Sequence, residues 1–367
     1  MYEVSEALAT ALEEQRLYIR VTCGETVLGS DQVSGVRYTA SCGGEGTITI
    51  GAVTAAMVNL TVIGRRDWLD EIITLEVGAE ASGAIQYIPL GTFAIAECSK
   101  GEYTTELVGY DAAYYVMGAE YVPTVTEGAT IAEILEDVAE QCGLTLAPLP
   151  SRRAVSHQNL YDYSVTGDDL TGYTCREMAG IIAALVGCNV LIDRAGELAL
   201  RWFAYAGSSF LTDYYSGSLV LDKEFRLGFI ACTVPVRSTV ESITSRTIRV
   251  GHGTTGFSIQ SPYMTQTILD EVWLYIGGRL FNPGSISLIG GLLFEPGDMI
   301  GIREPGGNSY RFPIQVLELT IDGGCQATLR MSAQGSAETA ANVTGTVAER
   351  FRLVNSQIEE LRGRLSS

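Results

Sequence analysis

Basic residues are scarce in this chain of 367 residues, which has 24 Lys and Arg against 43 Asp and Glu. The formal charge of -19 repels phosphate, and this excludes a conventional duplex-binding protein. Charged residues of either sign make up only 18% of the chain, below the roughly 25% of average proteins, while apolar residues reach 46%. We therefore expect partner subunits to cover part of an apolar surface.

The sequence also lacks a run that predicts a membrane span. The apolar stretch Met178–Ile192 is interrupted by Gly180, Gly187 and Asn189, and it falls short of the roughly 18 apolar residues that a spanning helix needs. Residues 1–6 contain early acids and no basic region followed by an apolar core, so they do not predict a secretory signal. We therefore expect synthesis in a cytoplasm.

Cysteine and histidine motifs are missing as well. The eight cysteines form no C-x-x-C pair, which fits neither a disulfide framework nor a zinc knuckle, so we predict small and mostly buried side chains. They are Cys23, Cys42, Cys98, Cys142, Cys175, Cys188, Cys232 and Cys325. The two histidines, His157 and His252, stand in no H-E-x-x-H motif, and a zinc hydrolase would have to recruit distant carboxylates. We predict no metal and no cofactor.

Short β-branched and aromatic runs separated by glycine fill the first third of the chain. They follow a helix predicted over 4–15 and indicate an antiparallel, barrel-like β domain over residues 1–117. The predicted strands cover 17–21, 47–50, 58–62, 72–77, 91–95 and 105–108. The predicted fold class of the chain is therefore mainly β.

Two capping boxes mark helices in the next region. Residues 130–133 and 174–177 both read T-x-x-E, in which the Thr hydroxyl and the Glu carboxylate satisfy first-turn amides reciprocally. Each is followed by apolar residues at helical spacing and then by a glycine, Gly143 or Gly187. Both patterns predict a helix that ends at its glycine.

A hairpin and a second β region complete the folded part. Residues 190–201 predict two strands joined by a turn with Gly196, so residues 118–205 form an α+β insert domain. Strands return over 206–335, with one helix near 262–277 that begins after Ser261-Pro262. This region predicts a second tube-like β-barrel domain.

The last segment, 336–367, is predicted as a linker and a C-terminal coiled-coil helix. Its apolar residues follow steps of four and three, which is the a/d seam of a left-handed coiled coil. We predict that this seam forms the oligomer contact: Val347, Phe351, Val354, Ile358, Leu361 and Leu365. The same spacing also suits a single helix that packs on its own domain.

One glycine-rich string, Gly251 to Gly256, matches the letters G-x-G-x-x-G of a dinucleotide-binding turn. In that motif a helix must follow, so that its N-terminus faces the pyrophosphate. Here residues 257–260 predict a strand instead. We predict a glycine-rich hairpin and no nucleotide site.

Acidic pairs and clustered tyrosines are the remaining candidates for chemistry. Paired carboxylates serve glycosidases, but adjacent acids more often face solvent, which is what we predict for Asp67 with Asp70, Asp168-Asp169 and Glu359-Glu360. A sugar-binding platform and a domain or subunit interface both fit Tyr110, Tyr114, Tyr115 and Tyr121. No G-x-S-x-G elbow occurs, and we predict no catalytic residue.

Several motifs, in their order along the chain, resemble phage tail-tip and baseplate-hub proteins. They are Ile85–Phe93, Val108–Ala112, Tyr121–Pro123, Thr174–Glu177, Ile192–Leu198, Phe294–Ile300, Gly307–Tyr310 and Ile321–Gly324. The resemblance spans nearly the whole chain. The chain is also similar to the N-terminal module of tail-associated lysins and endopeptidase tail proteins.

The resemblance implies a structural role without catalysis. Two tube-like domains per subunit would form the ring of a trimer at the distal end of a virion tail, between a tail-tube or distal-tail ring and a spike or fibre. DNA would pass through without specific binding, and contact with the host cell wall is a further expectation. From the negative charge of the chain we also expect acidic side chains to line the channel, where they would repel DNA. A peptidoglycan hydrolase and a carbohydrate-binding receptor module are the alternatives.

Overall fold

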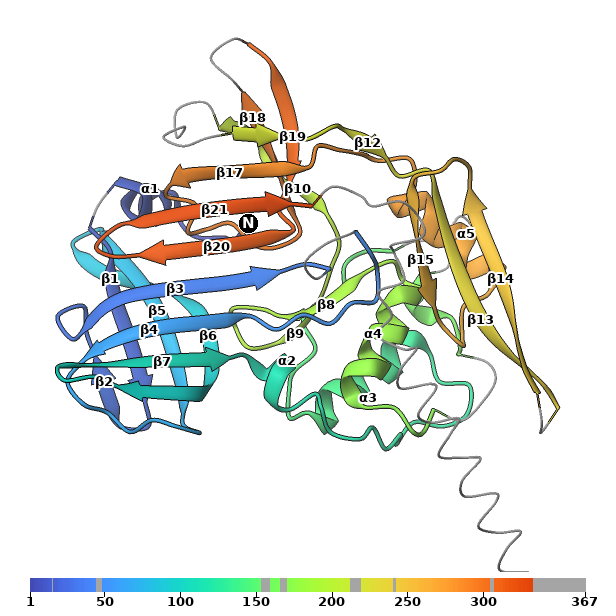
Figure 1. Ribbon diagram of the computed structural model, residues 1–367, viewed down its shortest axis with the longest axis horizontal. Coiled ribbons are helices and arrows are strands. Elements are labelled where there is room, and N and C mark those ends of the chain that lie inside the picture. Colours follow the sequence, from blue (N-terminus) through green and yellow to red (C-terminus); the bar gives the residue numbers. More distant parts are fainter. Residues whose placement is uncertain are drawn as a thin grey trace, which may run out of the picture.

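The computed structural model describes residues 1–14, 16–43, 48–152, 159–165, 170–211, 219–239, 242–303 and 307–332 (Figure 1). Strands predominate in these ranges, so the prediction of a mainly β protein is confirmed. The predicted coiled-coil residues 347–365 lie outside the described ranges.

The first region contains one helix and seven strands that agree with most of the predicted ones. They are α1 (Glu6–Glu14), β1 (Tyr18–Cys23), β2 (Thr26–Leu28), β3 (Val33–Ser41), β4 (Met57–Ile63), β5 (Ile72–Ala81), β6 (Ala84–Lys100) and β7 (Thr104–Tyr110). The sheet curls, so that β1 and β5 cross behind β3 and β4 in Figure 1. Apolar side chains alternate with polar ones along β1, β4 and β7, and the apolar ones fill the inside of the curl.

Strands from the far end of the sequence extend the same sheet. They are β11 (Leu219–Leu221), β17 (Gly284–Ile289), β20 (Val316–Ile321) and β21 (Cys325–Met331). The order is β11-β17-β21-β20-β3-β4-β7-β6-β5-β1-β2. β20 pairs with β3 in antiparallel register, from Val316 opposite Ser41 to Ile321 opposite Val36. One eleven-stranded sheet therefore joins the two predicted β regions, and β11 and β2 are its edges.

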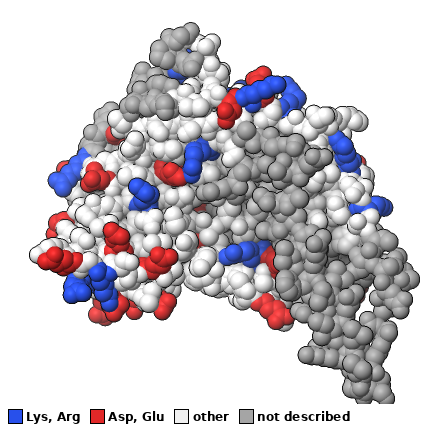
Figure 2. All heavy atoms as spheres, in the orientation of Figure 1, with Lys and Arg blue, Asp and Glu red and all other residues white. Residues whose placement is uncertain are grey.

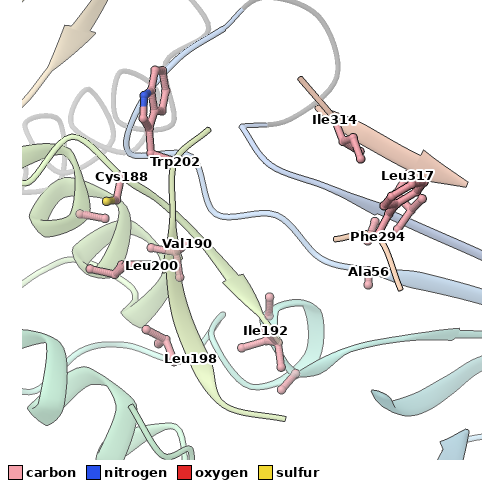
Figure 3. Close-up of a cluster of buried hydrophobic side chains, with 14 of the residues drawn as sticks. Ala56, Cys188, Val190, Ile192, Leu198, Leu200, Trp202, Phe294, Ile314 and Leu317 are labelled. Carbon is pink, nitrogen blue, oxygen red and sulfur yellow. The ribbon is translucent and has the colours of Figure 1, made fainter. Parts of the chain in front are cut away.

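The residues between the two β regions form helices at the two capping boxes and a hairpin at the strands predicted over 190–201. The elements are α2 (Ala112–Tyr115), α3 (Ile131–Gln141), η1 (Leu160–Asp162), α4 (Cys175–Leu185), β8 (Asn189–Ile192) and β9 (Leu198–Arg201). Both capping boxes are present, at Thr130 with Glu133 and at Thr174 with Glu177. In Figure 3, Val190, Leu198 and Leu200 of the hairpin lie beside α4, whereas Phe294 and Leu317 lie against strands of the large sheet. The hairpin thus separates two parts of one apolar core.

The remaining elements form small sheets and one helix. They are β10 (Ala204–Leu211), β12 (Phe225–Arg226), β13 (Phe229–Thr239), β14 (Ser242–Gly251), β15 (Gly256–Gln260), α5 (Gln266–Ile276), β16 (Leu280–Phe281), β18 (Asp298–Arg303) and β19 (Ser309–Pro313). The sheets are β10-β18-β19, β12-β16 and β14-β13-β15.

The predicted strand 47–50 is wrong for its described residues, because 48–50 have no strand conformation. Ile48 and Ile50 are nevertheless buried. The backbone next to them bonds to the insert, with Gly51 N donating to Cys188 O at 2.8 Å. Sequence periodicity identified a buried segment, but the residues after it pair with β8, through a parallel bridge between Val53 and Val190. Gly51 also packs against α4, where a Cβ would lie 2.7 Å from Gly180 O.

The predicted hairpin at Gly251–Gly256 is also wrong. β14 and β15 do not pair with each other, because both pair with β13, one on each side. The connection crosses the start of β13 closely, since a Cβ at Gly228 would lie 2.6 Å from the carbonyl oxygen of His252. A strand follows the string, as predicted, and no helix N-terminus faces it.

The helix predicted from Pro262 begins four residues later, at Gln266. The hydroxyl of Thr265 accepts a hydrogen bond from Ile268 N at 3.2 Å, which is the N-cap contact. The hydroxyl of Ser261 accepts a bond from Tyr263 N at 3.4 Å and forms a separate local turn. Two adjacent cap-like signals were present, and the second one starts the helix.

Candidate functional site

The outward face of the eleven-stranded sheet is polar along its width. Outward positions alternate with buried ones along β1, β4, β5 and β21. Many carry short polar side chains: Thr22, Asn59, Thr61, Thr74, Thr92, Thr320 and Thr328. A sheet face of this composition is suited to water or to a polar partner, and not to the core of the same chain.

Cross-strand contacts order this face. Arg20 on β1 donates from Nε and Nη2 to the two carboxylate oxygens of Glu76 on β5, at 2.5 and 2.7 Å. Its guanidinium carbon also lies 4.0 Å from the ring centre of Tyr87 on β6. Gly78 provides room for that ring, because a Cβ there would lie 2.9 Å from Tyr87 Cδ1. Three adjacent strands are thereby linked through their outward side chains.

Carboxylates outnumber bases on the outward face, where Arg37 on β3 is also exposed. Two ion pairs neutralise their own members, Arg20 with Glu76 and Arg330 with Glu318. Three further outward carboxylates have no ion-pair partner within the described ranges: Glu80, Glu97 and Glu106. Acidic side chains, with some basic ones among them, also gather at the lower left of Figure 2, over the half of the molecule that β1 to β7 build. Such a face does not favour phosphate.

A small polar pocket lies on the other side of β3, where the sheet meets the β8–β9 hairpin and the loop before β18. Its lining includes Tyr38, Thr54, Asp111, Arg194, Arg201 and Glu295. Arg201 Nη2 lies 3.3 Å from the Glu295 carboxylate. The pocket therefore collects charged groups from three segments that are distant in the sequence.

Asp111 is the most deeply buried acid of this pocket, with 3% of its surface exposed against 9% for Glu295. Burial raises the pKa of its carboxyl to about 7, although three backbone N–H groups and the charge of Arg176 favour the charged form. Ala56 N donates to Oδ2 at 2.7 Å and Ala113 N donates to Oδ1 at 3.0 Å. Asp111 is the N-cap of α2 and holds the start of β4 against it.

Arg194 is the buried base of the pocket. It belongs to the predicted turn after β8, and only 5% of it is exposed. Its Nη2 donates to the carbonyl oxygens of Leu292 and Phe294, each at 2.8 Å. These bonds fasten the hairpin to the loop before β18. Sequence reasoning missed this role, because a charged turn residue ordinarily faces solvent.

Residues predicted as candidates for chemistry do not converge on one place. Asp67 pairs with Lys100 at 2.8 Å, and His252 lies in the exposed connection between β14 and β15. His157, Asp168-Asp169 and Glu359-Glu360 lie outside the described residues. Among the residues that the structure describes, no group of His, Cys, Asp and Glu is placed to hold a metal ion.

The tyrosine cluster divides into two parts. Tyr110 and Tyr114 stack with ring centres 4.4 Å apart, and Tyr114 is 54% exposed. Tyr121 is 1% exposed and donates to Asp137 Oδ2 at 2.6 Å. Only Tyr110, Tyr114 and Tyr115 can therefore take part in a surface. All eight cysteines are free and six of them are buried, in agreement with their predicted role.

No helix in the described part of the chain is long and apolar enough to cross a membrane. No protein-family model matches the sequence, and no curated protein matches it at a significant level.

Among the solved structures that match the chain, two tail proteins cover most of its length. The tail protein from Neisseria meningitidis MC58 has a TM-score of 0.56 and 14% identity, with 86% of this chain and 97% of that chain covered. The prophage MuSo2 43 kDa tail protein from Shewanella oneidensis has a TM-score of 0.53 and 13% identity, with 86% and 98% covered. This chain has the fold of phage tail proteins. The resemblance that the sequence motifs indicate is thereby confirmed for the fold, and the outward sheet face is a surface of a tail-protein fold.

Proposed function

We propose that the chain is a structural component of the distal end of a virion tail, a baseplate hub or tail-tip protein. The observation that carries the proposal is the fold, which two tail proteins share over 86% of this chain. A role in assembly also accounts for the large uncovered sheet face and for the apolar composition of the sequence. An enzymatic role has no comparable support, since the matching structures are described as tail proteins.

We further propose that three copies form a ring. Residues 1–117 and 206–335 would each supply one tube-like domain to it, with 118–205 as an insert and 336–367 as an axial coiled coil through Val347 to Leu365. The strands at the two ends of the eleven-stranded sheet, β11 and β2, would meet neighbouring copies. The polar, acidic sheet face would line a channel, where like charges keep passing DNA from adhering.

The proposed position of the ring, at the distal end of a virion tail, determines which partners it would contact. A tail-tube or distal-tail ring would contact one side of the ring, and a spike or fibre the other. Contact with the host cell wall would occur only when the tail reaches the cell. Synthesis would take place in the cytoplasm of the infected bacterium.

The native mass of the purified protein tests the ring. We expect a trimer whose mass is constant over a range of concentrations. A version that ends at Gly345 lacks the heptad residues, and it should dissociate at higher concentration than the full chain, because the coiled coil no longer holds the copies together. A monomer at all concentrations, for the full chain, would contradict the ring.

A further inference from the structure

An apolar row crosses four neighbouring strands of the outward sheet face. Ile72 on β5 lies opposite Ala94 on β6, Ala94 lies opposite Tyr110 on β7, and Tyr110 lies opposite Met57 on β4. Side chains that are directly opposite in this way contact each other. The row spans three strand spacings, roughly 14 Å. It interrupts a face that is otherwise rich in threonine.

The row continues at its Tyr110 end onto α2. Tyr114 stacks on Tyr110, and Tyr115 beside it is 37% exposed. Arg176 donates to the carbonyl oxygens of Ala113 and Tyr114, which holds α2 in place. The aromatic end of the row is therefore preorganised.

A pinned turn adds a projecting apolar side chain at the Ile72 end. Trp68 is buried and anchors the turn, while Leu69 is 49% exposed and Ile72 is 51% exposed. Asp70 adopts a φ of 63°, and its N donates to Ile95 O at 2.9 Å. Ile95 N donates in return to Glu71 O at 2.9 Å. The fold thus holds Leu69 outward through backbone bonds to β6.

Acidic side chains surround this end of the row. Asp70, Glu71 and Glu97 are exposed and belong to no ion pair in the described part of the chain. Glu97 lies on the outward face opposite Val108, in the row adjacent to Tyr110. Two of the nearby bases have partners, since Lys100 pairs with Asp67 and Arg176 bonds to backbone carbonyls. In the loop before Leu69, the guanidinium carbon of Arg66 lies 5.8 Å from the ring centre of Trp68, and Arg65 is an exposed base beside three exposed acids. An apolar centre with an acidic rim is the result.

We infer that this apolar row and its acidic rim, here named the Ile72 patch (Leu69, Ile72, Ala94, Tyr110, Met57 and Tyr114), bind a different protein through an apolar segment flanked by Lys or Arg. Exposed apolar groups within a polar rim are typical of a protein interface, and the unpaired carboxylates select basic neighbours. A second copy of this chain fits poorly, because its net charge is -19 and its own patch carries the same acids.

The inference deepens the proposed function and rests on it in one respect, namely that the partner is another tail protein. The test uses tail particles purified from the bacterium that encodes the chain. The photoreactive residue benzoylphenylalanine replaces Ile72 in one variant. A matched variant carries it in place of Tyr103, which is 73% exposed at the opposite end of β7. After irradiation, the cross-linked peptides are identified by mass spectrometry.

We expect position 72 to cross-link to a different tail protein, at a peptide in which Lys or Arg flanks apolar residues, and position 103 not to reach that peptide. A cross-link from position 72 to a second copy of this chain, to a peptide without basic residues, or to nothing in intact particles overturns the inference and leaves the proposed function standing. Particles that lack the chain altogether overturn the proposed function, and the inference falls with it.

A charge variant tests the rim separately. Asp70→Asn, Glu71→Gln and Glu97→Gln are combined with the photoreactive residue at 72, and Asn is suitable at 70 because it tolerates a positive φ. We expect the cross-link yield to fall several-fold at low salt and to become less sensitive to salt. The control replaces Glu80 and Glu106, which are on the same sheet face, by Gln. Equal yields in both variants contradict a basic partner.

Discussion

The guanidinium of Arg20 and the carboxylate of Glu76 form a bidentate pair across β1 and β5, with N–O distances of 2.5 and 2.7 Å. The pair is stacked beside Tyr87 on the outward sheet face, where both members remain partly exposed. An exposed ion pair contributes only about 0.2–1 kcal/mol to stability. Its importance here is geometric, because it fixes how β1, β5 and β6 present their side chains.

Gly78 should be intolerant of a side chain because of this arrangement. A Cβ at position 78 would lie 2.5 Å from Gln86 O and 2.9 Å from Tyr87 Cδ1. We expect Gly78→Ala to lower the free energy of unfolding by about 1–3 kcal/mol, as overpacking does. The control is Gly118→Ala, where nothing lies within 4 Å of the added Cβ. Urea denaturation of both variants measures the difference, and equal midpoints would show that β6 can shift freely.

Asp111 should make stability depend on pH. The pKa of its carboxyl is raised to about 7 by burial, from 3.8 for an exposed Asp. The folded state then binds a proton that the unfolded state releases, so the free energy of unfolding rises as pH falls through 7. Between pH 8 and pH 5 we expect a gain of about 2–3 kcal/mol from this group.

The comparison for Asp111 is Asp111→Asn, which cannot titrate. Denaturation at pH 8 and pH 5 should show a weaker pH dependence in the variant than in the natural chain. In the variant, the side-chain NH2 of Asn replaces one of the two oxygens that accept from Ala56 N and Ala113 N, so one backbone N–H loses its acceptor. We therefore expect the variant to be less stable than the natural chain at pH 5. Identical pH dependence in the two proteins would assign the effect to other groups.

Arg194 should be important for the attachment of the hairpin. Arg194→Met leaves the carbonyl oxygens of Leu292 and Phe294 without their buried donor. We expect a loss of about 2–4 kcal/mol, from roughly 1–3 kcal/mol for each unsatisfied buried group. Arg226→Met is the matched control, because Arg226 donates to Gly278 O from an exposed position. Thermal unfolding of the two variants compares them, and similar losses would mean that burial of the bond is unimportant.

The two kinds of tyrosine should respond differently to loss of the hydroxyl. Tyr121→Phe removes the 2.6 Å bond to buried Asp137, and we expect a loss of about 1–2 kcal/mol. Tyr114→Phe keeps the ring that stacks on Tyr110 and should be neutral within about 0.5 kcal/mol. Chemical denaturation tests both. A larger effect at 114 would mean that its hydroxyl has an internal partner.

Local signals predicted the local structure well. The capping boxes at Thr130 and Thr174 identified α3 and α4, since a cap needs only residues within one turn. Alternation of apolar residues identified β4 and β7. Competing local signals produced the errors: Ser261 and Thr265 both resemble caps, and the glycine string after β14 resembles a hairpin turn.

The candidate surfaces were less predictable. The Ile72 patch depends on the register of four strands, and register follows from pairings that single-sequence periodicity does not specify. Arg194 is buried only because a loop about 100 residues later supplies two carbonyl acceptors. No pattern in the sequence indicates that these residues lie close together in the fold.

By itself, the sequence determined the β-rich character, the helices of the insert and the acidic, weakly charged composition, because each depends on residues close together in the chain. The tertiary structure alone decided that β20 pairs with β3 and so merges two β regions into one sheet. It also decided which acids and apolar side chains share the outward face. The merger depends on pairing between distant segments, such as Val36 with Ile321, and the shared face depends on the register of closer strands, such as Ile72 with Ala94. Hydrogen bonds between strands leave no periodic trace in either segment.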